Sequence, residues 1–156
     1  MSLEKLSELV TLKVNTERVV DGQNDHYKAI YTVGGDALIG TDLKKARMVA
    51  DSASKKMTIT LPEPKLVLAR VDMNRTKPYD ISARSWINPG IWFTGDKAKL
   101  IDRILKEAQK IIEEECMTEE YVKNSKTQAE FIIKTLYSEL GWEVEIIWER
   151  NPPAKQ

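Results

Sequence analysis

Few side chains in this sequence could carry chemistry, and they are scattered along it. The only histidine, His26, follows an acidic, turn-forming stretch, and no serine stands in a nucleophile-elbow sequence, so we expect a surface histidine rather than a general base. The only cysteine, Cys116, falls at the apolar spacing of a helix, which favours a buried, unreactive thiol. The sequence therefore predicts no catalytic residue.

The oxygen donors that could bind a cation also fall short of a site. Asp21, Asn24 and Asp25 lie close together but lack the number of ligands and the long loop of a calcium site. Gly34-Gly35-Asp36 is not followed by the Gly-Lys-Ser/Thr of a phosphate-binding loop, and we expect a tight hairpin turn there. Histidine and cysteine do not cluster at zinc spacing. We accordingly predict neither a metal nor a cofactor.

The segment 80–95 is the strongest candidate for an interaction surface. It reads as a long irregular loop, and such loops are either functional or packed by their own aromatic residues. Tryptophan is enriched at interfaces, although a tryptophan here could instead fill a local core. The candidate interaction residues are Arg84, Trp86, Trp92 and Phe93.

Length and charge limit the classes of function. A chain of 156 residues favours a single domain, with a core over 9–149 and a tail over 150–156. The 24 basic and 24 acidic side chains give a net charge of zero, which argues against a general nucleic-acid binder. No apolar run is long enough to span a bilayer, and the opening Met1-Ser2-Leu3 leaves room for an upstream segment outside this sequence.

The strands and helices must position these residues. The stretch 56–73 alternates apolar and polar residues up to Leu61, breaks at Pro62 and Pro64, and resumes as an apolar run, which predicts two strands. Further strands are expected at 9–14, 27–33, 37–43 and 142–148, with a polar loop over 15–25 that turns at Asp21-Gly22 and an undecided strand or helical turn over 44–51.

Two helices are expected near the C-terminus. Asp96 is the expected N-cap of a helix over 97–116, Thr118 that of a second helix, and Gly141 the glycine that ends it. Strands that cluster early and helices that cluster late predict an α+β fold. We expect a largely antiparallel sheet of about five to seven strands, with the helical hairpin packed on one face and the final strand returning to the sheet.

The order of these elements resembles a bacterial family catalogued as domain of unknown function 4230. The resemblance rests on Gly40-Thr41-Asp42-Leu43, on the strand that ends in Leu61-Pro62-Glu63-Pro64, and on the closing GWEVEIIWE, and it covers about 9–149. It implies a domain outside the cytoplasmic membrane, tethered to it by a hydrophobic N-terminal segment that members often carry. This sequence departs by lacking that segment, so we expect either that the segment lies upstream in the full-length protein or that this member is soluble. It supplies no catalytic residues.

We expect a non-enzymatic, envelope-associated module that binds a partner protein or a small ligand, and no nucleic acid. Two alternatives remain open. One is an enzyme with an unrecognised, hydrolytic site, for which a deep pocket with converging acids would argue. The other is a self-associating homo-oligomeric scaffold that uses the helical hairpin or an exposed sheet edge.

Overall fold

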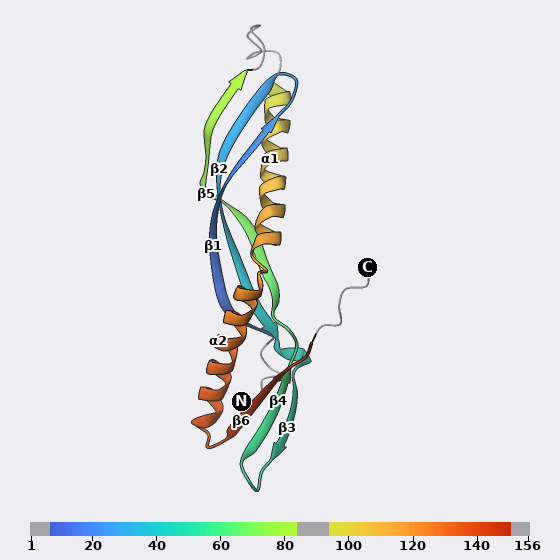
Figure 1. Ribbon diagram of the computed structural model, residues 1–156, viewed down its shortest axis with the longest axis vertical. Coiled ribbons are helices and arrows are strands. Elements are labelled where there is room, and N and C mark those ends of the chain that lie inside the picture. The colour runs from blue at the N-terminus through green and yellow to red at the C-terminus, as the bar shows by residue number, and fades with distance from the viewer. Residues whose placement is uncertain (1–6, 84–93, 151–156) are drawn as a thin grey trace. The chain divides into compact units, whose positions relative to one another are not determined.

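Six strands, a short 3-10 helix and two long helices form the structure, a computed structural model that describes residues 7–83 and 94–150 (Figure 1). The elements in chain order are β1 (Glu8–Gln23), β2 (Tyr27–Asp42), η2 (Leu43–Lys45), β3 (Arg47–Asp51), β4 (Lys56–Leu61), β5 (Lys65–Ala83), α1 (Thr94–Glu115), α2 (Glu119–Ser138) and β6 (Glu143–Trp148). Strands come first and helices late, which confirms the predicted α+β class and the two C-terminal helices. The final strand returns to a sheet, as predicted.

The strands form two sheets where the sequence predicted one. The first has the order β1-β2-β5 and the second the order β3-β4-β6. In the second sheet β3 and β4 form an antiparallel hairpin, whereas β6 joins β4 in parallel, with Met57 opposite Val144. A parallel partner requires a long connection, and here that connection includes both helices.

The chain divides into two compact units. Unit 1 comprises 1–13, 38–67 and 117–156, and unit 2 comprises 14–37 and 68–116. Strands β1, β2 and β5 contribute residues to both units, whereas α1 belongs to unit 2 and α2 to unit 1. Each unit has buried residues of its own.

In unit 1, α2 packs on the sheet formed by β3, β4 and β6. The alternation in β4 places every second side chain in the core, because successive residues of a strand point to opposite faces. The buried cluster consists of Leu43, Met57, Ile59, Leu61, Ile133 and Tyr137. Partly buried residues of β6, Val144, Ile146 and Trp148, pack against it.

The ends of α2 follow the predicted signals. The hydroxyl of Thr118 accepts a hydrogen bond from the backbone N–H of Tyr121 at 3.2 Å, which confirms the N-cap. Gly141 has a φ of +78°, a conformation that suits glycine, in the turn after the helix. Within the helix, the buried hydroxyl of Ser125 lies 2.7 Å from that of Thr11 and hydrogen-bonds with it.

In unit 2, α1 covers a sheet surface that contains glycine. A Cβ atom on Gly22 would lie 2.9 Å from Cγ1 of Ile104, and one on Gly35 would lie 2.3 Å from Cδ1 of Ile112. The missing side chains therefore let the isoleucines of the helix reach the backbone of the strands. The other buried apolar residues of the unit are Val14, Val20, Tyr27, Ala29, Tyr31, Val33, Ala37, Leu100, Ala108 and Cys116.

Two turns predicted at glycines are wrong, because these glycines lie inside strands and make room for neighbouring side chains. Gly34-Gly35-Asp36 lies inside the continuous strand β2, and Asp21-Gly22 lies inside β1, so most of the predicted polar loop over 15–25 is strand. A Cβ on Gly34 would lie 2.5 Å from Cβ of Arg75. These glycines permit close approach of neighbouring residues. In the sequence, a glycine with this role looks the same as a glycine in a turn.

Three further boundaries differ from the sequence prediction. α1 begins at Thr94, so Asp96 lies within its first turn rather than at its N-cap. β5 extends to Ala83, which makes the first part of the predicted irregular segment strand. The undecided stretch 44–51 contains the end of η2 and all of β3. No helix in the described part of the chain is both long enough and apolar enough to cross a lipid bilayer.

Candidate functional site

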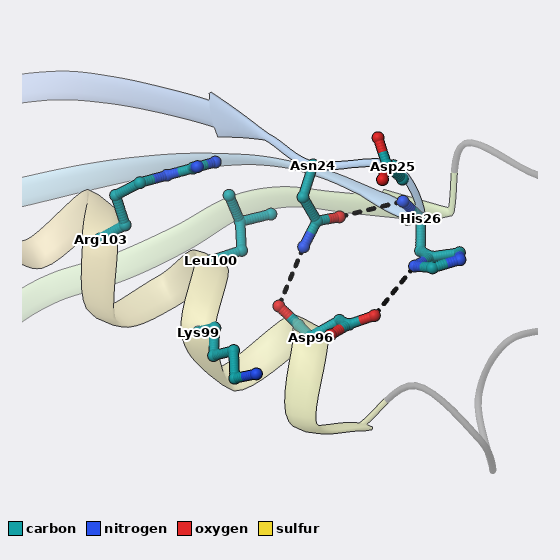
Figure 2. A pocket seen from close by; sticks show the side chains of 7 residues that line it. All are labelled: Asn24, Asp25, His26, Asp96, Lys99, Leu100 and Arg103. Carbon is teal, nitrogen blue, oxygen red and sulfur yellow. Dashed lines mark hydrogen bonds and ion pairs between the residues drawn. The ribbon is translucent and has the colours of Figure 1, made fainter.

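A hollow in unit 2 brings together polar and charged side chains from two parts of the chain (Figure 2). It lies where the connection between β1 and β2 meets the first turns of α1, and its volume is about 250 Å³. The lining residues are Asn24, Asp25, His26, Asp96, Lys99, Leu100 and Arg103.

Asn24 shapes the connection and ties it to the helix. Its Oδ1 accepts hydrogen bonds from the backbone N–H groups of His26, at 3.0 Å, and Tyr27, at 2.8 Å. Its Nδ2 donates to the backbone carbonyl of Asp96 at 3.0 Å. Asparagine is favoured in such turns because its side chain can replace backbone partners. One residue thus fixes both sides of the hollow.

His26 and Asp96 form a polar contact between the β1–β2 connection and α1. Nδ1 of His26 lies 3.0 Å from Oδ2 of Asp96, and both side chains are about one-third exposed. Figure 2 shows the two side chains turned toward each other across the hollow. Asp96 lies in the first turn of α1, where the positive end of the helix dipole stabilises a carboxylate. The contact is an ion pair when the imidazole is protonated.

Two cationic side chains of α1 line the hollow. Lys99 and Arg103 are four residues apart, which places them on the same face of α1. Arg103 donates from Nη2 to the backbone carbonyl of Gln23, so it also holds the end of β1. Between them Leu100 is buried and contributes an apolar surface. With Asp25 and Asp96, the hollow offers both signs of charge around an apolar patch.

This geometry limits the chemistry of the hollow. A histidine oriented by a carboxylate is the base half of a nucleophilic site. However, the seven lining residues include neither serine, threonine nor cysteine, so no side-chain hydroxyl or thiol is placed there for the imidazole to activate. Among the described residues, the dyad therefore faces water or a bound substrate rather than a side-chain nucleophile.

A second hollow of unit 2, of about 410 Å³, lies beside a charged cluster. Asp36, nearly buried on β2, accepts a hydrogen bond from Nη2 of Arg75, whose Nε donates to Asp72 at 2.8 Å. The hydrogen bond from Arg75 lowers the pKa of Asp72, and that same bond raises the pKa of Arg75. The guanidinium is thus already occupied by two carboxylates. We regard the cluster as structural and the first hollow as the better candidate. The lining residues are Glu17, Thr32, Asn74, Arg75, Lys77, Pro78 and Tyr79.

The residues singled out from the sequence have mixed outcomes. Arg84, Trp86, Trp92 and Phe93 lie outside the described residues, so the predicted interaction surface stays a prediction. Cys116 is buried, as predicted, and burial raises the pKa of its thiol. Within 7–83 and 94–150, no group of three or more histidine, cysteine or acidic side chains could hold a metal ion.

The sequence did not predict the helix side of the hollow. It indicated Asp96 only as the N-cap of the helix, and it did not single out Lys99 or Arg103. A signal was present: an acid at the start of a helix, followed by two cations on one face, marks a charged helix end. What the sequence does not show is that His26 lies against that end.

The fold is α+β, and the described residues form a small, open hollow lined by side chains of both charges. The chain belongs to the family described as "Protein of unknown function (DUF4230)", whose profile matches residues 1–148. This confirms the resemblance drawn from Leu61-Pro62-Glu63-Pro64 and the order of elements. Comparisons with curated proteins and with solved structures find no match. The family description names no reaction.

Proposed function

We propose that this chain is a non-enzymatic binding module whose hollow takes a small polar ligand that carries both an ammonium and a carboxylate group, such as an amino acid or a short peptide. The observation that supports this is the placement of Asp25 and Asp96 with Lys99 and Arg103 around one hollow. Each sign of charge on the ligand then has a partner of opposite sign.

The size and the apolar patch support the same class of ligand. Pockets for drug-sized molecules usually have volumes of about 300–1,000 Å³, and this one, at about 250 Å³, is slightly smaller. Leu100 provides a surface for a short apolar side chain. The exposed charges lie in water, so we expect weak binding, with a Kd of about 0.1–1 mM.

Calorimetric titration with single amino acids and dipeptides tests the proposal. Lys99→Gln removes one cation of the hollow, and Lys97→Gln removes an exposed cation of the same helix that does not line it. We expect Lys99→Gln to weaken binding about tenfold and Lys97→Gln to leave it unchanged. Absence of binding by the wild-type chain, or an equal loss in both variants, would contradict the proposal.

The contact between His26 and Asp96 supports a second candidate, a hydrolytic site in which the imidazole activates water. A chromogenic ester assay tests this with His26→Gln and with Lys97→Gln as the control. Hydrolysis should fall at least about a hundredfold in His26→Gln. Equal rates in the two variants would eliminate this candidate.

We also propose that the protein works in the cell envelope, tethered outside the cytoplasmic membrane. The support is membership of the family that the sequence resembles. Fractionation of the full-length gene product with protease added to intact cells tests this. Cleavage without lysis is the expected result, and recovery of an intact protein with the soluble cytoplasmic fraction would contradict it.

A further inference from the structure

One edge of the sheet in unit 1 is formed by a strand with exposed side chains. β3 stands at the end of the order β3-β4-β6, and none of the described residues pairs with its outer side. All five residues of β3 are exposed, and Val49 is 74% exposed. An edge strand offers a row of backbone N–H and C=O groups to a further strand.

The pairing of β3 with β4 defines which residues share a face. Met48 lies opposite Ile59, which is fully buried, so Met48 and Ala50 belong to the core side of the sheet. Arg47, Val49 and Asp51 consequently lie on the opposite face, because side chains alternate along a strand. The charged ends of β3 thus share one face with its exposed valine.

The sequence of β3, Arg-Met-Val-Ala-Asp, is self-complementary in charge. If two copies pair antiparallel about a two-fold axis at Val49, Arg47 of each copy lies opposite Asp51 of the other. Met48 then lies opposite Ala50, and the two Val49 side chains face each other. Opposite charges directly across two strands stabilise their pairing, whereas like charges destabilise it.

Both charged residues remain accessible for such a contact. Arg47 forms an ion pair with Glu149 of its own chain, yet its side chain is 72% exposed. The carboxylate of Asp51 accepts hydrogen bonds from the hydroxyl of Ser54, at 2.7 Å, and from the N–H of Ala53, at 3.0 Å, in the turn that follows β3. Carboxylate oxygens can accept further hydrogen bonds.

The other edge of the sheet lacks this complementarity. β6 and the residue after it carry three charged side chains, Glu143, Glu145 and Glu149, all of them acidic. Pairing of β6 with β6 of a second copy would therefore place carboxylates near one another without a cation from either strand. The charges favour association through β3 and disfavour it through β6.

We propose that β3 pairs antiparallel with β3 of a second copy of this chain, so that the two sheets of β3, β4 and β6 become one continuous sheet. The contact is isologous, with the same residues contributed by each copy, and it closes after two chains. Two strands of five residues bury less than the roughly 1,200 Å² of a standard interface, so the dimer is weak. We expect a Kd of about 10 µM to 1 mM.

Charge exchange at β3 gives a test with an internal rescue. Arg47→Asp places two acids opposite each other, and Asp51→Arg places two cations opposite each other. The double variant, Arg47→Asp with Asp51→Arg, restores complementary pairs in reversed order. In sedimentation equilibrium, each single variant should dimerise at least about tenfold more weakly than the wild type, and the double variant should recover most of the loss.

Two further variants guard against loss of folding and against a different interface. Val49→Lys changes a side chain that is mostly exposed in the monomer and should also weaken the dimer. Ile147→Lys, on β6, should leave the dimer unchanged. Thermal melts of the variants, followed by circular dichroism, verify that each one folds.

Three outcomes would overturn the proposal. The first is a wild-type chain that stays monomeric up to about 1 mM. The second is that folded Val49→Lys still dimerises and that the double variant, Arg47→Asp with Asp51→Arg, does not recover the affinity lost in the single variants. The third is loss of the dimer in Ile147→Lys alone, which would place the contact at β6.

Discussion

The two helices are packed on their sheets in opposite ways. In unit 1, α2 meets large side chains, and Ile133 and Tyr137 of the helix lie in one cluster with Met57, Ile59 and Leu61 of β4. In unit 2, α1 inserts Ile104 and Ile112 where the strands carry Gly22 and Gly35. The first contact is filled by large side chains from both partners, whereas the second includes points where a helix side chain lies directly on strand backbone.

This difference predicts opposite sensitivities to mutation. A core filled from both sides loses stability when atoms are removed, because the cavity left behind closes only in part. A contact in which the side chain of a helix lies on bare backbone loses stability when atoms are added. The three predictions below test this contrast, from the largest expected effect to the smallest.

Ile59→Ala should have the largest effect. The side chain is fully buried in β4, and its truncation should lower the free energy of unfolding by about 2–5 kcal/mol. Ile147→Ala is the matched control, since that isoleucine is 47% exposed on the neighbouring strand and should cost less than about 0.5 kcal/mol. Urea denaturation measures both, and equal losses would show that the unit 1 core does not depend on filled volume.

Gly35→Ala should cost about 1–3 kcal/mol, although it adds a single methyl group. The new Cβ would lie 2.3 Å from Cδ1 of Ile112 and 3.1 Å from the backbone oxygen of Arg70. Ile112→Val removes Cδ1, so the double variant should lose less stability than the two single variants summed. Gly95→Ala is the control, because a Cβ there meets no atom within 4 Å. Simple additivity would indicate that Ile112 does not limit the space at Gly35.

Tyr137→Phe should have the smallest effect, and in the opposite direction. The phenol is buried, and its hydroxyl has no hydrogen-bond partner in the described part of the chain. Removal of an unpaired buried hydroxyl should leave stability unchanged or raise it by up to about 1 kcal/mol. Thermal unfolding at neutral pH measures this. A loss above about 1 kcal/mol would show that the hydroxyl has a partner.

The same substitution should change the response to alkaline pH. Burial raises the pKa of Tyr137 above its ordinary value of 10.0, because the neutral phenol is favoured in the folded state. The contribution of this residue is therefore complete below pH 10.0 and is lost as the pH rises through the folded pKa. The stability difference between Tyr137→Phe and the wild type should consequently grow above that pH.

Local signals predicted unit 1 well. The capping signals Thr118 and Gly141 and the alternation in β4 act over a few residues, so the sequence shows both the signal and the structure that it produces. The α+β class followed from the order of these elements. The parallel pairing of β6 with β4 could not be predicted, because it depends on a strand that is distant in sequence.

Unit 2 was harder to predict because its glycines have a tertiary role. Gly34 and Gly35 look the same in the sequence whether they form a turn or accommodate Arg75 and Ile112. The candidate site was missed for a related reason. His26 and Asp96 each have an ordinary local interpretation, and only their 3.0 Å contact makes them a pair.

The parallel pairing of β4 with β6 also determines when each unit can be completed during synthesis. A ribosome has produced every residue of unit 2 once it has passed Cys116. The sheet of unit 1 cannot be completed until Trp148, which pairs with Leu61, has been synthesised. Until then one side of β4 lacks its partner strand. The nascent chain therefore exposes an incomplete sheet in unit 1 for longer than in unit 2, and this is the interval in which a chaperone would have most to protect.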